Sequence, residues 1–316
     1  MNNTDNAFQK VQPYLLEKPR PLIGAETIQL LLIREILDYT VLRTEETREL
    51  NTVHTPLSIN KADQPVRRVA FLASKQKAAE SRELEYLLRT ALKTARITEQ
   101  ECYLKDNLCM KCPRCGLYGG TSTVAGQQER ANIKHRIEYS TAFSLLPFDD
   151  IGTAITFNAI NDRNQTTGQA LGQRFAVQPA TLFSSVITLK SVTQCELIMT
   201  VKTLLTCKSY GAESRIGGDV RNSIWGIVAG WEEVITSLEL TLELADKLDS
   251  LSPETLNQII EEKYKLMTGN PQHVVVLEPT EVEALVKECA ETDLDKDFLE
   301  KAYQDIANYR TEQLAR

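Results

Sequence analysis

The chain has 316 residues, of which 42% are hydrophobic and 25% are charged, so its composition is that of a folded protein with one large or two modest domains. These proportions exclude a disordered tail, a collagen and a coiled coil. No apolar run approaches the roughly 18 residues that a membrane span needs, and the N-terminal residues lack the pattern of a secretory signal, so we expect a cytoplasmic protein with no membrane partner.

Charge is unevenly distributed along the chain. The net charge is −7, but residues 232–316 hold 20 acidic and 8 basic residues, which gives this part a net charge of −12. Residues 1–231 hold 23 acidic and 28 basic residues, a net charge of +5. We therefore expect an anionic partner to bind the first part of the chain.

The first half of the chain predicts strands and one helix. The apolar run at 28–33 predicts a buried strand, and residues 69–73 predict a second one. Residues 44–68 are polar and interrupted by two prolines, which predicts a long loop. Leucine and alanine recur at helical spacing over residues 81–95, and this spacing predicts an amphipathic helix.

The second half continues with strands. Residues 151–157 alternate like a half-buried strand, and residues 158–180, which lack an apolar stripe, predict a projecting hairpin or long loop. Residues 186–189 and 197–205 are rich in β-branched side chains and predict two strands. A glycine-rich stretch follows at 211–230.

The chain after Trp231 predicts helices. Ser252–Pro253 has the composition of a helix start, Thr280 with Glu283 predicts a capping box, and the apolar spacing over 298–306 predicts a last amphipathic helix. The whole pattern predicts an α+β fold, in which a sheet with few helices carries two insertions and a helical C-terminal part.

Four of the seven cysteines lie close together in the sequence, at Cys102, Cys109, Cys112 and Cys115. A C-x-x-C turn brings two sulfurs near one ion, and a structural zinc site needs four ligands. Cys102 is the nearest remaining thiol, and Gly116 allows a tight turn after Cys115, so we assign a Zn²⁺ site to these four cysteines. A site with four protein ligands has no open position and would fold an insertion rather than catalyse.

Alternatives to this assignment remain. His135 is the nearest imidazole and competes with Cys102 as the fourth ligand. The spacing also matches part of an iron–sulfur motif, although the fourth cysteine of that motif and its proline are missing. The third possibility is four free thiols without a metal.

Two segments contain candidate phosphate contacts. Ser74, Lys75 and Lys77 lie between a predicted strand and a predicted helix, where amides, a hydroxyl and two amines can bind phosphate. Residues 210–222, YGAESRIGGDVRN, combine glycines that allow close backbone approach with two arginines, and Tyr210 is a candidate for stacking on a base. A solvated loop and a plain surface turn are the alternative interpretations.

Catalytic motifs are weak. None of the three histidines lies in a recognisable serine or cysteine nucleophile motif. Asp149 and Asp150 are adjacent, and side chains at neighbouring positions diverge, so joint acid–base chemistry or metal binding is not expected from this pair alone.

Four patterns in this order resemble the backbone subunit of type I-D CRISPR effector complexes (Cascade), a member of the repeat-associated mysterious protein (RAMP) superfamily. The patterns are SKQKAAESRELEYLLRTAL at 74–92, CMKCPRCGLYGG at 109–120, residues 158–183 with Asp162, Thr167–Gly168 and QPATLF, and YGAESRIGGDVRN at 210–222. The resemblance covers roughly residues 70–225 and does not include the acidic C-terminal part.

The resemblance implies a ferredoxin-like, RNA-recognition-motif-like (RRM-like) palm with a zinc insertion, a thumb hairpin and a helical C-terminal part. The implied boundaries are 1–100 for the first part of the palm, 101–120 for the zinc-binding insertion, 121–157 for the palm continuation, 158–180 for the thumb hairpin, 181–230 for the palm completion with its glycine-rich loop, and 231–316 for the acidic helical part.

The resemblance also implies a function without catalysis. Copies of such a subunit stack head to tail along a guide RNA (crRNA), join other CRISPR effector subunits, and present the guide for pairing with a target DNA strand, or target RNA, in antiviral defence. Contacts to phosphates position the guide and leave its bases free. The implied contacts are Ser74, Lys75, Lys77, Arg215 and Arg221, with Phe175 as a wedge between bases or, alternatively, an anchor on a neighbouring subunit.

Two other functions compete with this scaffold. A metal-dependent nuclease subunit would cut the target strand at regular intervals with one aspartate, for which Asp149, Asp150 and Asp162 are the candidates. A zinc-stapled protein-interaction module would use its acidic C-terminal part to bind a basic partner.

Overall fold

The structure is a computed structural model that describes residues 5–43, 49–98, 101–103, 107–121, 132–157, 163–164, 166, 172–211 and 218–315. The strands are β1 (Thr27–Ile36), β2 (Thr52–Pro56), β3 (Pro65–Phe71), β4 (Gly120–Thr121), β5 (Asn132–Ile133), β6 (Ile137–Tyr139), β7 (Ala142–Ser144), β8 (Gly152–Phe157), β9 (Gly172–Val177), β10 (Leu182–Lys190), β11 (Val220–Gly230) and β12 (Val275–Val276). The helices are α1 (Asp5–Val11), α2 (Ala73–Thr94), α3 (Pro113–Tyr118), α4 (Phe148–Ile151), α5 (Gln194–Thr206), α6 (Ser237–Ala245), α7 (Pro253–Ile259), α8 (Pro279–Glu291) and α9 (Lys296–Leu314).

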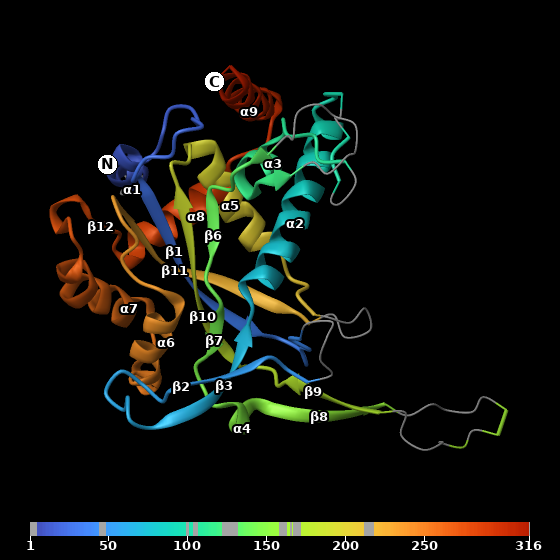
Figure 1. The fold of residues 1–316 in the computed structure, drawn as a ribbon, viewed down its shortest axis with the longest axis vertical. Helices are drawn as coiled ribbons and strands as arrows, with labels where there is room; N and C mark the ends of the chain where they lie inside the picture. The colour runs from blue at the N-terminus through green and yellow to red at the C-terminus, as the bar shows by residue number, and fades with distance from the viewer. Residues whose placement is uncertain are drawn as a thin grey trace.

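An antiparallel sheet runs through the centre of the molecule in the order β12-β11-β1-β10-β7-β3-β2, with β6 also paired to β10 (Figure 1). Strand β1 pairs with β10 on one side and with β11 on the other along its whole length. Leu30 and Leu32 pack into the hydrophobic layer on one face of the sheet, while Leu31 and Ile33 pack into the layer on the other face. The continuous apolar run at 28–33 is therefore a strand buried on both faces, which confirms the prediction.

Helices cover both faces of this sheet. Buried residues of α2, α5, α8 and α9 form one layer, and buried residues of α6 and α7 form the other. The helices that follow Trp231 therefore contribute to both layers of the core, and the acidic part of the chain is integral to the fold. Among the described residues, none of the helices is both long enough and apolar enough to span a membrane.

Strands β8 and β9 form a separate two-stranded ribbon. Their antiparallel pairing runs from Gly152 with Val177 to Phe157 with Gly172, and the ribbon projects away from the main sheet (Figure 1). The predicted projection is thus a hairpin in its described part, and it begins at 152 rather than at 158.

The prediction of a strand over 197–205 is wrong, because these residues lie in α5. Thr193 caps the first turn through its side chain, and Glu196 completes a capping box. The apolar side chains of α5 then recur at helical spacing and pack into the core. The cap and the spacing therefore outweigh the strand preference of the β-branched residues.

The prediction of a long loop over 44–68 is also wrong for its described part. Strands β2 and β3 form a hairpin whose register runs from Thr52 with Val69 to Pro56 with Pro65. Pro56 and Pro65 form the last pair of this hairpin, next to its turn. Proline has no amide proton to donate, and at the end of the strand pair this loss interrupts the hydrogen bonds between the strands least.

The helix start predicted at Thr280 is displaced. Pro279 is the first residue of α8, and the capping box is formed by Glu278 and Glu281. The predicted start at Ser252, by contrast, is confirmed, because its side chain accepts a hydrogen bond from the amide of Thr255 and caps α7.

A buried ion pair joins the cysteine-bearing helix α3 to the sheet. The Arg136 side chain is fully buried, and its Nη1 donates to Oε2 of Glu196 at 2.8 Å and to the carbonyl of Ser191 at 3.1 Å. Its Nη2 donates to the other oxygen of Glu196 and, at 3.1 Å, to the carbonyl of Gly116 in α3. One guanidinium therefore connects the start of β6, the turn between β10 and α5, and α3.

Replacing Arg136 by methionine should lower the free energy of unfolding by about 3–5 kcal/mol, because the Glu196 carboxylate is left buried without its partner. The matched variant is Lys190→Met, which removes a less buried cation that pairs with Glu138 and Glu233, and about 1 kcal/mol or less is expected there. Urea denaturation measures both values. Equal losses would contradict the role given to Arg136.

Candidate metal centre and candidate nucleic-acid interface

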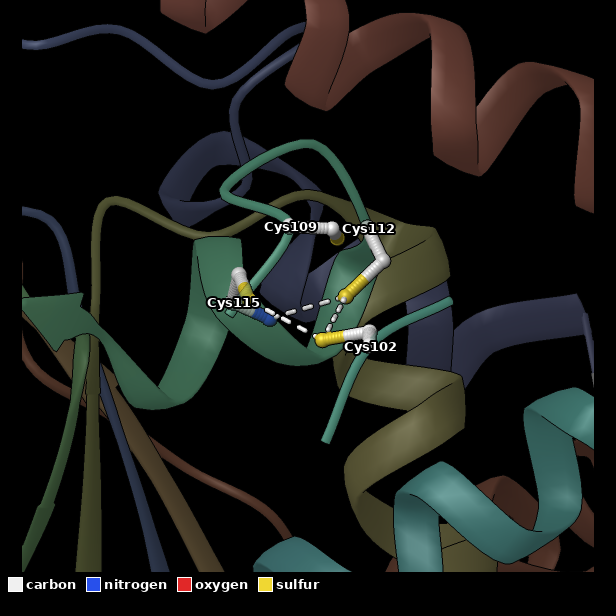
Figure 2. Close-up of side chains that lie close together, drawn as sticks. All are labelled: Cys102, Cys109, Cys112 and Cys115. Carbon is white, nitrogen blue, oxygen red and sulfur yellow. Dashed lines mark hydrogen bonds between the residues drawn. The ribbon is translucent and has the colours of Figure 1, made fainter. Parts of the chain in front are cut away.

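The structure brings the four predicted thiols together (Figure 2). Cys112 precedes α3 as its N-cap, and its sulfur accepts a hydrogen bond from the amide of Cys115. In the same way, the sulfur of Cys109 accepts from the amide of Lys111. Each turn therefore points a backbone donor at a sulfur, and such a donor would stabilise the negative charge of a metal-bound thiolate.

The distances between the sulfurs fit one metal ion. The Sγ atom of Cys102 lies 3.5 Å from that of Cys115 and 3.7 Å from that of Cys112, and all four sulfurs lie within 4.8 Å of one another. Tetrahedral coordination with bonds of about 2.3 Å places sulfurs about 3.8 Å apart. Among the described residues, these cysteines are the one group of three or more ligand side chains close enough to share an ion, and the group does not include His135.

The cluster is shielded from solvent. Cys102, Cys112 and Cys115 are buried, Cys109 is half-buried, and Tyr303 of α9 packs against them. Hydrogen bonds from the neighbouring thiols Cys109 and Cys112 lower the pKa of Cys102, whereas hydrogen bonds with Cys102, Cys109 and Cys115 raise the pKa of Cys112. The cluster can therefore hold negative charge at a buried place, and a bound cation would compensate this charge.

Gly116 has a different role from the one predicted. Its φ angle is not in the left-handed region, which Gly119 occupies instead with φ of 77° at the end of α3. A Cβ atom at Gly116 would lie 2.3 Å from Cδ1 of Ile306. This glycine therefore allows α3 to pack closely against α9.

A basic cleft lies where α2 begins. It has a volume of about 580 Å³ and is lined by Arg43, Leu72, Ser74, Lys75, Ala78, Ala79, Arg82, Ser209, Tyr210 and Gly211. The described residues of the lining include three cations and no acidic residue. The structure thus joins two segments, one at the helix start and one at 209–211, that the sequence singled out separately.

Two cations of this cleft were missed in the sequence. Arg82 lies seven residues after Lys75, and this spacing places both side chains on one face of α2. The spacing was a signal that could have identified Arg82. Arg43 follows β1 in an irregular segment, and its place in the cleft depends on contacts far apart in the chain.

Other predicted contacts lie elsewhere. Lys77 does not line the cleft, and burial together with the charge of Arg114 lowers its pKa. Arg221 lies on β11, where its Nε donates to Oε2 of Glu35 at 3.0 Å. Arg215 lies outside the described residues, as does Asp162.

Tyr210 is placed differently from the prediction. Its side chain is 2% exposed, and its hydroxyl donates to Oε1 of Glu80 at 2.7 Å. A ring buried in this way offers no open face to a base, so the stacking role predicted for Tyr210 is wrong in this conformation. The residue instead forms part of the cleft wall.

The base of the projecting hairpin is packed by aromatic contacts. The ring centroid of Phe175 on β9 lies 5.9 Å from that of Phe148 on α4, and Arg67 lies over the Phe148 ring at 4.2 Å. Phe175 remains 39% exposed, which leaves both of its predicted roles open.

The predicted catalytic aspartates have no metal-binding arrangement in the part of the chain that the structure describes. Asp149 is exposed and forms an ion pair with Arg67 at 2.9 Å. Asp150 is also exposed, and neither carboxylate belongs to a described group of three ligands.

The base of the glycine-rich loop is fixed by a close backbone contact. The amide of Tyr210 donates to the carbonyl of Gly218 at 3.1 Å, and Ser209 forms a bridge with Asp219. Gly218 has φ of 64°, and a Cβ atom there would lie 2.5 Å from the backbone of Gly211. Glycine is therefore required at this position to hold the cleft wall in place.

Comparison with known proteins identifies the family. The Csc2 CRISPR family matches residues 10–304, which is most of the chain. The chain belongs to this family. The prediction of a CRISPR family is therefore confirmed, although no match was found among curated proteins.

Solved structures agree with the family assignment. The crystal structure of Csc2 from Thermofilum pendens superposes with a TM-score of 0.67 at 21% sequence identity, and the match covers 98% of this chain and 97% of that one. This likeness shows a shared fold. A CRISPR RNA-guided surveillance complex (TM-score 0.49, 10% identity, 83% and 99% covered) and a type IV-B CRISPR complex (TM-score 0.44, 13% identity, 62% and 89% covered) are more distant and do not establish the fold of this Csc2-family chain.

Replacing Gly218 by alanine should destabilise the base of the loop, because the residue is left-handed and its new Cβ would meet the backbone of Gly211. We expect a loss of about 1–3 kcal/mol in unfolding free energy and faster hydrogen exchange at the amide of Tyr210. The control is Gly269→Ala, where a Cβ atom would meet only the side chain of Glu232, at 3.5 Å. Unchanged exchange at Tyr210 in Gly218→Ala would contradict this account.

Proposed function

We propose that the chain is a guide-RNA-binding backbone subunit of a type I-D CRISPR effector complex that acts in the cytoplasm without cutting nucleic acid. The observation that carries this proposal is the cleft at the start of α2. Its lining combines Lys75, Arg82 and Arg43 with the Ser74 hydroxyl, and no acidic residue belongs to it in the part of the chain that the structure describes. Such a surface attracts phosphates and does not read base sequence, which is what a scaffold along a guide requires.

The core of the sheet supports the proposal of an RRM-like palm. Four strands lie in the order β11-β1-β10-β6, and the chain enters them as β1, α2, β6, β10, α5 and β11. Both helices pack into the same hydrophobic layer. This order and this layering are those of a ferredoxin-like domain.

The β8–β9 hairpin supports the proposal of a thumb that reaches another subunit. It projects from the sheet (Figure 1), and the side chain of Phe175 on β9 is 39% exposed. In a head-to-tail assembly this ring would act as a wedge between guide bases or as an anchor on the next copy. Other effector subunits and a target DNA strand would complete the complex, and Lys77, Arg215 and Arg221 remain proposed contacts to the guide.

We propose zinc as the metal of the cysteine cluster. Four thiol ligands, a buried place and sulfur separations near those of a tetrahedron favour a structural Zn²⁺ ion. The ion would hold α3 and residues 101–103 together, and it would not take part in chemistry because all four positions are filled by protein.

Replacing Lys75 by glutamate should weaken binding to single-stranded RNA by about tenfold at low salt and reduce the slope of log affinity against log salt by about 0.7. The reason is the loss of one phosphate contact in the cleft. The control is Lys287→Glu on α8, which changes the net charge by the same amount on an exposed helix surface. Fluorescence anisotropy with a labelled oligonucleotide over a salt series gives both quantities.

An equal loss of affinity in the two lysine variants would show that overall charge, and not the cleft, binds the RNA. An unchanged slope in Lys75→Glu would remove Lys75 from the interface.

Replacing Cys112 by serine should remove the metal and destabilise the fold more than it alters RNA binding. We expect less than one zinc per chain by elemental analysis and a lower melting temperature, because a serine hydroxyl is a poor zinc ligand. The control is Cys195→Ser, a half-buried thiol of α5 outside the cluster. Equal zinc content in both variants would contradict the zinc assignment.

A further inference from the structure

A buried network of charged and polar groups lies beneath the basic cleft. Arg34 of β1 is fully buried, and its Nη1 donates to Oε1 of Glu80 on α2 at 2.8 Å and to Oδ1 of Asn222 on β11 at 2.7 Å. Glu80 is fully buried as well. The network therefore joins the central strand, its neighbour β11 and the helix that forms one wall of the cleft.

The hydroxyl of Tyr210 completes this network from the opposite wall. It donates to Oε1 of Glu80 at 2.7 Å and accepts from Nδ2 of Asn222 at 2.9 Å. Burial and the charge of Glu80 raise the pKa of Tyr210 well above its usual value, so the hydroxyl stays protonated and remains a donor. Tyr210 lies between Ser209 and Gly211, and all three residues line the cleft.

The network is costly as a source of stability. The Nε and Nη2 atoms of Arg34 are buried, and neither has a hydrogen-bond partner among the described residues. Buried polar groups without partners destabilise a fold. A buried ion pair can often be replaced by hydrophobic side chains without loss of stability. We therefore explain the network by the positions in which it fixes β1, α2, β11 and the 209–211 segment, and not by a contribution to the free energy of unfolding.

We propose that the Tyr210 hydroxyl is a latch that holds the 209–211 segment against α2 and thereby sets the distance between the two walls of the cleft. Tyr210, Glu80 and Arg34 are positioning residues, because they are buried and act on RNA through Lys75, Arg82 and the backbone of Gly211. The inference rests on the proposed function, since it concerns the same cleft.

The test is Tyr210→Phe in the full chain. This change keeps the ring, which packs edge-on against Phe71 at 5.3 Å, and removes only the hydroxyl. We expect single-stranded RNA to bind about tenfold more weakly with an unchanged salt slope, because no cation is lost. Hydrogen exchange at the amide of Tyr210 should become faster, since the segment is less firmly held.

The matched control is Tyr264→Phe. Tyr264 is also buried, and its hydroxyl also donates to a buried carboxylate, Oε1 of Glu243 at 3.0 Å, but it does not line the cleft. We expect this variant to lose comparable stability while its RNA affinity and the exchange at Tyr210 stay as in the unmodified chain. If Tyr210 had a purely structural role, the two variants would bind RNA with the same affinity at temperatures well below melting.

The outcomes separate the latch from the proposed function. If Tyr210→Phe binds RNA as the unmodified chain does while Lys75→Glu is weakened, the latch is overturned and the RNA cleft stands. If the unmodified chain binds no RNA, the proposed function fails, and the exchange measurement still decides the latch. Unchanged exchange in Tyr210→Phe overturns it.

Discussion

The buried contact between Arg34 and Glu80 fixes α2 against the central strand β1, and α2 forms one wall of the basic cleft. Both side chains are removed from water, so the loss of either one leaves a charge without compensation in the core. The same contact therefore fixes the position of α2 beside the central strand, and with it the geometry of the proposed RNA surface.

The proposed metal site acts on the same helix. Arg114 beside Cys115 donates to the hydroxyl of Ser81 at 3.0 Å, and Arg89 donates to the carbonyl of Cys102, so the cysteine segment contacts α2 at two places about two turns apart. Arg136 then ties α3 to the sheet. A metal in the cluster would hold together the cysteine segment that contacts α2 at Ser81 and Arg89.

Features that depend on local spacing could be predicted from the sequence. The thiols of Cys109, Cys112 and Cys115 meet because C-x-x-C turns dictate their own geometry, and β1 is buried on both faces because its apolar run is continuous. Features that depend on distant contacts could not. Arg43 lines the cleft and Tyr210 contacts Glu80 through contacts between segments far apart in the chain. The strand predicted over 197–205 is a helix because the capping box at Thr193 and Glu196, which directly precedes it, outweighs its β-branched content.

The most direct test of the account is to map the protein–RNA contact by photochemical cross-linking. The full chain is bound to single-stranded RNA containing 4-thiouridine, irradiated and digested, and the cross-linked peptides are identified by mass spectrometry. We expect cross-links in the peptides that contain residues 72–82 and 209–211, the two walls of the cleft. Cross-links confined to α8 and α9, or no cross-links at all, would contradict it.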